Sequence, residues 1–161
     1  MGDEGVYVAV VGPSEAADDV LEAAFEVGRL LALAGVTVLT GGLGGVMAAA
    51  ASGAAEGGGT VVGVLPGTDR AVAHPRLTVA LATGLGELRG GLLVRGADAV
   101  ICVGGSWGTL AEVALARRTG VPLVCLRGWR VLDADGVEQE LVHAATADEA
   151  VATCLAAARP A

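Results

Sequence analysis

Two glycine-rich turns constrain this chain more than any other feature of its sequence. One spans residues 41–45 and the other residues 104–109, and each lies between a short apolar run and a run with helical spacing. A strand that passes through a tight turn into a helix leaves unpaired backbone N–H groups at the helix N-terminus, where the helix dipole attracts anions. Glycine lets a ligand approach such a backbone closely because it has no side chain. We therefore expect both turns to bind the phosphate of a small molecule.

The rest of the chain repeats the alternation of strand and helix. Short valine-rich runs predict strands, and apolar residues every three or four positions predict helices. The expected strands cover residues 6–11, 36–40, 60–65, 77–82, 99–103 and 121–126. The expected helices cover residues 17–34, 46–56, 88–96 and 109–119, and a last helix runs from a capping box at 146–149 to about residue 158. Residues 67–76 resemble a loop, and residues 127–145 show no clear pattern.

Alternation of this kind predicts an α/β fold with a Rossmann-like, doubly wound and mainly parallel sheet that has helices on both faces. The 161 residues are expected to form a single domain. Both glycine turns then lie beyond the carboxyl ends of the strands, where such sheets bind ligands.

Composition fits this fold and excludes several classes of partner. Hydrophobic residues make up 53% of the chain but include only one Phe, one Tyr and two Trp, so aliphatic side chains must fill the core. With a net charge of −8 and no basic run, we expect neither a nucleic acid nor a membrane as partner. All ten basic residues are arginine, which excludes the phosphate-binding lysine of a P-loop and a Schiff-base lysine for pyridoxal phosphate.

The cysteines and the N-terminus point to a reducing compartment. Cys102, Cys125 and Cys154 are odd in number, have apolar neighbours and lack the paired spacing of a metal site. We expect buried thiols, no bound metal and no cofactor. No secretory signal is visible, because Asp3 and Glu4 stand where a basic start would be. The expected location is the cytoplasm.

Neither glycine turn matches a common catalytic or nucleotide-binding motif. Counted from Gly42, the dinucleotide fingerprint requires a glycine where Met47 stands, and no acidic residue follows at the distance that holds a ribose. The sequence has no G-x-S-x-G elbow, and Ser106 has no evident histidine partner. His74 and His143 are isolated and are expected to be surface or loop residues. A dehydrogenase and a serine hydrolase are therefore disfavoured.

The two turns together resemble those of the LOG-type family, long labelled lysine-decarboxylase-like, which includes cytokinin-activating phosphoribohydrolases. The first half of the resemblance comprises Gly41-Gly42-x-Gly44-Gly45-Val46-Met47, Gly53-Ala54, Gly57-Gly58 and Gly63-x-Leu65-Pro66. The second half comprises Arg89, Asp98-Ala99, Gly104-Gly105-Ser106-Trp107-Gly108-Thr109 and Glu112. In the family signature P-G-G-x-G-T-x-x-E, Gly104 replaces the proline and Ser106 replaces the second glycine. These departures and the chain length make the sequence look closer to a related branch that includes molybdenum-cofactor carrier-like proteins.

The resemblance implies an activity and assigns roles to residues. Such enzymes cleave the N-glycosidic bond of a nucleoside 5′-monophosphate, releasing free base and ribose 5-phosphate through a transition state expected to resemble an oxocarbenium ion. Glu112 matches the catalytic carboxylate that stabilises this charge and orients the attacking water, and Arg89 matches the catalytic arginine. The expected binding residues are Gly41, Gly42, Gly44, Gly45, Met47, Gly104, Gly105, Ser106, Trp107, Gly108 and Thr109. The resemblance also implies a homodimer.

Each assignment has an alternative. Thr109 and Glu112 are spaced as a capping box, in which the glutamate ties back to the helix start. Arg89 could also be a solvated helix residue, the glycine turns could be tight connections only, and Trp107 could serve packing instead of stacking on a base. The alternative to the hydrolase is a non-catalytic carrier or sensor of a phosphorylated ligand such as the molybdenum cofactor. The two departures from the family signature favour this alternative.

Overall fold

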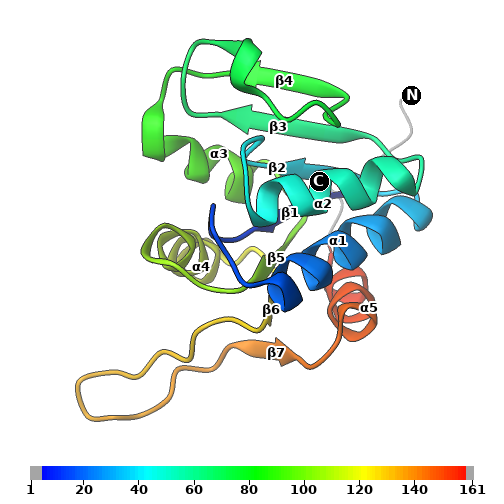
Figure 1. The fold of residues 1–161 in the computed structure, drawn as a ribbon. Coiled ribbons are helices and arrows are strands. Elements are labelled where there is room, and N and C mark those ends of the chain that lie inside the picture. The colour runs from blue at the N-terminus through cyan, green and yellow to red at the C-terminus, as the bar shows by residue number, and fades with distance from the viewer. Residues whose placement is uncertain (1–4, 159–161) are drawn as a thin grey trace.

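A parallel sheet lies at the centre of the computed structural model, which describes residues 5–158 (Figure 1). Its seven strands have the order β4-β3-β2-β1-β5-β6-β7, and each neighbouring pair is parallel. The strands are β1 (Tyr7–Val11), β2 (Thr37–Thr40), β3 (Val61–Leu65), β4 (Val79–Ala82), β5 (Ala99–Val103), β6 (Leu123–Leu126) and β7 (Val142–Ala144). The helices are α1 (Asp18–Leu33), α2 (Val46–Glu56), α3 (Arg89–Arg95), α4 (Trp107–Thr119) and α5 (Ala147–Ala157), with short 3-10 helices η1 (Arg70–Val72) and η2 (Gly86–Leu88). The predicted doubly wound α/β fold is confirmed.

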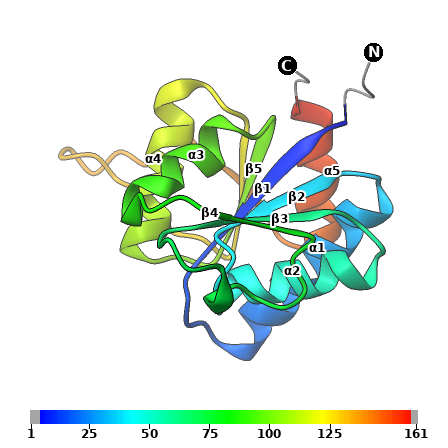
Figure 2. The same cartoon turned by 90° about the horizontal axis from the view of Figure 1, so that it is seen from above.

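Helices cover both faces of the sheet: α1, α2 and α5 lie on one face, and α3 and α4 lie on the other (Figure 2). Each face has its own apolar core because successive side chains of a strand point to opposite sides. In β5, Ile101 and Val103 belong to the core beneath α1, α2 and α5, whereas Val100 and Cys102 belong to the core beneath α3 and α4. All five residues of β5 are buried, as expected for a central parallel strand. Within residues 5–158, none of the helices is long and apolar enough to cross a membrane.

Helices α1 and α2 pack together through glycine. A side chain at Gly28 of α1 would overlap the carbonyl group of Ala50, and a side chain at Gly53 of α2 would overlap that of Phe25. The two backbones are therefore in direct contact, and the small-residue character of α2 follows from this contact. The pairing fixes the start of α2 relative to the ends of the strands.

Helix α4 begins at Trp107, two residues before the predicted start. Its first turn is capped by Ser106, whose hydroxyl oxygen accepts a hydrogen bond from the backbone N–H of Thr109 at 3.2 Å. Glu112 therefore lies well inside the helix, and the capping-box alternative for Glu112 is wrong.

The capping box predicted at residues 146–149 is present at the start of α5 in a variant form, in which the glutamate bonds to the residue before the cap. The Thr146 hydroxyl accepts from the N–H of Glu149 at 3.2 Å, and the Glu149 carboxylate accepts from the N–H of Ala145 at 2.8 Å. The first of these bonds satisfies a backbone donor that the first turn of a helix leaves unpaired, and the second ties Glu149 to the residue before the cap.

The segment between β6 and α5, for which the sequence shows no clear pattern, contains the seventh strand. β7 has only three residues, and Val142 and His143 are exposed, so it lacks the apolar run that identifies the other strands. Before β7 the chain forms a long protruding loop, which appears in yellow and orange in Figure 1. Within this loop Leu132 and Glu138 form an isolated antiparallel bridge.

Candidate functional site

A cleft of about 710 Å³ opens at the carboxyl edge of the sheet. This volume lies in the range typical of small-molecule sites. Residues that follow β1, β2 and β5 form one part of the lining, and residues of η2, α3 and α4 form the rest. Because β2 lies on one side of β1 and β5 on the other, the cleft lies at the switch point where doubly wound sheets bind ligands.

The structure brings most of the predicted site residues together at this cleft. Those that line it are Gly41, Met47, Arg89, Ser106, Trp107, Gly108, Thr109 and Glu112. The predicted residues outside the lining are Gly42, Gly44, Gly45, Gly104 and Gly105. Of these, Gly42, Gly45 and Gly104 have φ values of 75°, 60° and 71°, which side-chain-bearing residues rarely adopt. These three glycines give the turns their shape, and Gly41, Leu43 and Ser106 of the same turns line the cleft.

Arg89, at the first position of α3, has few partners in the protein. Its guanidinium group lies against Gly41, where any side chain would overlap it. Its one hydrogen bond to a described residue runs from Nη2 to the thioether Sδ of Met47 at 3.6 Å, which is a weak acceptor. Burial lowers the pKa of Arg89 and the nearby Glu112 raises it, but a guanidinium stays charged in proteins. Arg89 therefore brings a positive charge with unused donors to the cleft.

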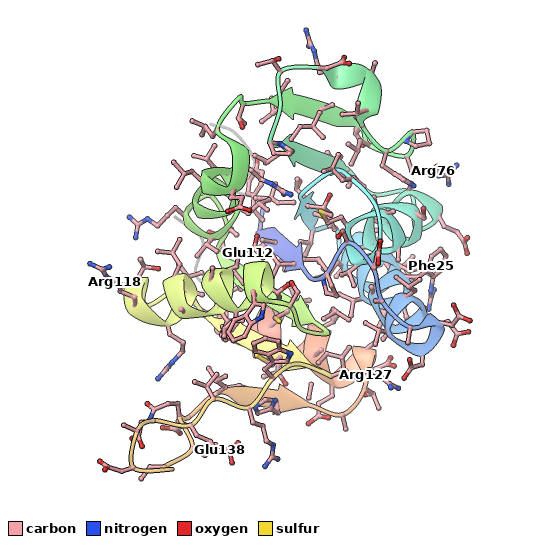
Figure 3. The ribbon with its side chains drawn as sticks, turned by 60° about the vertical axis from the view of Figure 1, so that its left-hand side comes forward. Phe25, Arg76, Glu112, Arg118, Arg127 and Glu138 are labelled. Carbon is pink, nitrogen blue, oxygen red and sulfur yellow. The ribbon has the colours of Figure 1, made fainter. Side chains whose placement is uncertain are left out.

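Glu112 projects from α4 toward α3 and lies against Gly90 (Figure 3). The carboxylate is half-buried and makes no hydrogen bond or ion pair with the described residues. Burial raises the pKa of Glu112 to about 7, and the positive charge of Arg89 opposes this effect. Near neutral pH this carboxyl group is therefore partly protonated, so that it can both donate and accept hydrogen bonds.

The start of α4 offers backbone donors to the same cleft. The Ser106 and Thr109 hydroxyl groups lie 2.8 Å apart and bond to each other, and Ser106 also accepts the N–H of Thr109. Among the described residues, the N–H groups of Trp107 and Gly108 have no acceptor. These two donors carry the positive end of the helix dipole and are suited to an anion.

A third loop, which the sequence analysis did not assign to the site, also lines the cleft. Gly12, Pro13 and Ser14 follow β1, and the Pro13 carbonyl accepts the N–H of Val46 at 3.0 Å at the start of α2. The signal was present in the sequence, because a Gly-Pro-Ser turn directly after the first strand must lie at the switch point of this fold. Glu87 and Leu88 of η2 are further lining residues with no local sequence signal.

The three cysteines lie outside this lining. Cys102, Cys125 and Cys154 are buried and form no disulfide, and burial raises the pKa of Cys154 to about 12. In the described part of the chain, no three His, Cys, Asp or Glu side chains gather in a way that could hold a metal ion.

Comparison with known proteins finds relatives over nearly the whole chain. A family model described as the SLOG cluster4 family matches residues 5–159. The molybdenum cofactor binding protein from the phototrophic bacterium Rippkaea orientalis has a similar structure, with a TM-score of 0.85 and 29% identity, covering 94% of this chain and 96% of that one. The molybdenum cofactor carrier protein MCP from Chlamydomonas reinhardtii has a TM-score of 0.82 and 32% identity, covering 95% and 98%. An uncharacterized protein from Archaeoglobus fulgidus is 36% identical over 134 residues, which cover 80% of this chain and 88% of that protein.

Proposed function

Because this chain belongs to the SLOG cluster4 family, we propose that it binds and carries a phosphorylated pterin of the molybdenum-cofactor type. The family is LOG-like, in agreement with the resemblance of the two glycine turns. Two similar solved structures bear the names of molybdenum cofactor binding and carrier proteins, and each covers more than nine-tenths of both chains. The cofactor is cargo in this proposal, so the protein needs to hold it and not to transform it. The cytoplasmic location expected from the sequence fits such a carrier.

The observation that carries this proposal is the half-buried Arg89 guanidinium, which no acidic group of the described residues neutralises within 4 Å. A phosphate monoester can accept two parallel hydrogen bonds from a guanidinium group. The free N–H groups of Trp107 and Gly108 provide further donors at the same cleft. Glu112, once protonated, does not repel the phosphate and can donate one more hydrogen bond.

The experiment that tests the carrier is recovery of cargo from cells. The chain is produced in a bacterial host that makes the molybdenum cofactor, purified, and treated with an oxidant that converts bound cofactor into a fluorescent pterin. We expect the wild type to retain pterin and Arg89→Ala to retain about 10- to 100-fold less, since a charged hydrogen bond contributes about 1.5–3 kcal/mol.

Arg95→Ala is the matched control for this experiment. Arg95 ends the same helix, is exposed and does not line the cleft, so its loss removes an identical charge elsewhere. We expect Arg95→Ala to retain wild-type amounts of pterin. Equal pterin in the wild type and in Arg89→Ala would contradict the proposal.

A second candidate function is the phosphoribohydrolase implied by the resemblance. The observation in its favour is that Glu112 and Arg89 share one cleft, and that burial brings the pKa of Glu112 to about 7, which suits proton transfer at neutral pH. One observation opposes it: the Ser106 hydroxyl accepts the N–H of Thr109. A glycine at this position of the family signature would leave that N–H free for the ligand.

Hydrolysis is tested by incubating the protein with a panel of nucleoside monophosphates and measuring free base by chromatography. Base release that both Glu112→Gln and Arg89→Ala abolish would support the hydrolase. Binding of a phosphorylated ligand without base release would support the carrier.

We also propose that the chain forms a homodimer. Leu85, Leu88 and Leu92 are 44%, 78% and 47% exposed and lie at or within η2 and α3 beside the cleft. Exposed leucines gathered on one surface indicate an interaction site. A second copy of the chain on this surface would bury them and cover one side of the cleft.

A further inference from the structure

The only two tryptophans of the chain are in contact with each other, and one of them, Trp107, lines the cleft. Trp107 is the first residue of α4, and Trp129 lies in the loop that follows β6. Their ring centroids are 4.9 Å apart and their planes meet at 88°, an edge-to-face arrangement that aromatic rings prefer. In a chain with so few aromatic residues, this pair is the main aromatic surface.

Trp129 is held in place by its surroundings. Its indole ring lies directly on Gly105, where any side chain would overlap it. Two residues earlier, Arg127 forms an ion pair with Asp19 in the first turn of α1, and Figure 3 shows Arg127 beside that helix. The loop thus contacts α1 through Arg127 and packs on the glycine turn through Trp129. Gly105, which does not line the cleft, makes room for Trp129.

Trp107, in contrast, remains open to ligands. Its side chain is 80% exposed, although the contact with Trp129 restricts its orientation. It lines the cleft together with Arg89 and Glu112. A tryptophan that served packing alone would be largely buried, since its ring carries a large apolar area. An exposed but oriented indole ring beside a phosphate-binding cleft is suited to a flat ring.

We propose that Trp107, braced by Trp129, is the subsite that stacks on the flat heterocycle of the phosphorylated ligand. The proposal rests on the proposed function for the phosphate, which Arg89 and the start of α4 would bind. It adds recognition of the ring to recognition of the phosphate, because stacking on an aromatic side chain needs only the flat face of a heterocycle. The site then selects phosphate esters that carry such a ring over simple sugar phosphates.

Calorimetric titration tests the subsite with three probes. They are the phosphorylated pterin obtained by oxidising the molybdenum cofactor, AMP as a second ring-bearing phosphate, and ribose 5-phosphate, which lacks a ring. We expect Trp107→Ala to weaken binding of the pterin about 10- to 100-fold and to change the affinity for ribose 5-phosphate less than about twofold. Trp107→Phe should recover most of the loss, because it keeps a ring.

Two further variants separate stacking from other effects. Trp129→Ala should cause an intermediate loss for the ring-bearing probes, since it removes the brace but leaves Trp107. Leu33→Ala, which removes another exposed apolar side chain at the end of α1, should bind like the wild type. Because Trp107 is exposed, its replacement should leave the thermal unfolding midpoint nearly unchanged.

The possible results distinguish this inference from the proposed function. Equal weakening of all probes by Trp107→Ala, or no weakening of any, would overturn the stacking subsite and show that the exposed ring serves another purpose, such as contact with a protein. If AMP binds in a Trp107-dependent way but the pterin does not bind, the stacking subsite stands and the carrier function falls.

Discussion

Arg89 and Glu112 differ from the other charged residues in their surroundings. Arg29 and Glu26 form a partly exposed ion pair on α1, with Nε and Oε2 2.8 Å apart, and this bond lowers the pKa of Glu26. In Glu112 burial has the opposite effect and raises the pKa to about 7. Partly exposed pairs contribute little to stability, whereas a half-buried carboxyl group without a hydrogen-bond partner destabilises the fold once it ionises. Ionised Glu112 therefore does not stabilise the fold, and its position beside Arg89 in the cleft is in keeping with the proposed role in ligand binding.

This difference predicts a pH-dependent effect of Glu112→Gln on stability. The pKa of Glu112 is about 7 in the folded protein, against an ordinary value of 4.5. At pH values between these two pKa values, the folded state binds more protons than the unfolded state. The free energy of unfolding therefore decreases as the pH rises through this range. We expect Glu112→Gln to be about 1–3 kcal/mol more stable than the wild type at pH 8 and nearly equal to it at pH 4.5.

Urea unfolding at the two pH values measures this effect. Glu56→Gln, at the exposed C-terminal end of α2, is the control and should match the wild type at both. If Glu112→Gln brings no gain in stability at pH 8, the carboxyl group of Glu112 ionises without hindrance in the folded protein.

At the scale of secondary-structure elements, the close contact between α1 and α2 predicts the effect of a substitution at Gly53. On helix propensity alone, Gly53→Ala should stabilise α2 by about 1 kcal/mol. Because a methyl group at this position would overlap the Phe25 carbonyl, the two helices must move apart. We expect a net loss of about 1–3 kcal/mol in the free energy of unfolding, measured by urea denaturation.

Ser52→Ala, one position earlier on α2, is the matched control. Ser52 is only partly buried and lines an open groove between α1 and α2, so the substitution should leave stability equal or slightly higher. If Gly53→Ala is as stable as Ser52→Ala, the two helix backbones are not in direct contact.

The first residue of α4 is an element boundary that the sequence pattern did not predict correctly. Thr109 and Glu112 have the spacing of a capping box, and Gly108 disfavours a helix that begins before it. The structure places Ser106 at the cap instead, since its hydroxyl accepts the N–H of Thr109. Two candidate caps lie three residues apart in the sequence, and in the folded protein Ser106 is the one that caps the helix.

At the scale of the whole molecule, the exposed leucines predict association. The wild type should have about twice the 15.7 kDa mass of one chain in light scattering coupled to size-exclusion chromatography. A double variant Leu88→Glu and Leu92→Glu should be monomeric, because two charges per chain cannot be buried in an apolar contact. Leu33→Glu, at an exposed site on α1, should remain dimeric. A monomeric wild type would contradict the homodimer.

The sequence by itself determined the alternation of strands and helices, the two glycine turns and the resemblance to the LOG-type family. These features are local: apolar periodicity and glycine act within a few residues, so α2 and β5 begin and end where they were predicted. Only the tertiary structure decided that β7 joins the sheet, that Glu87 and Leu88 line the cleft and that Trp129 rests on Gly105. These contacts join residues far apart in the chain, and they depend on strand order and close packing, which periodicity along a sequence does not encode.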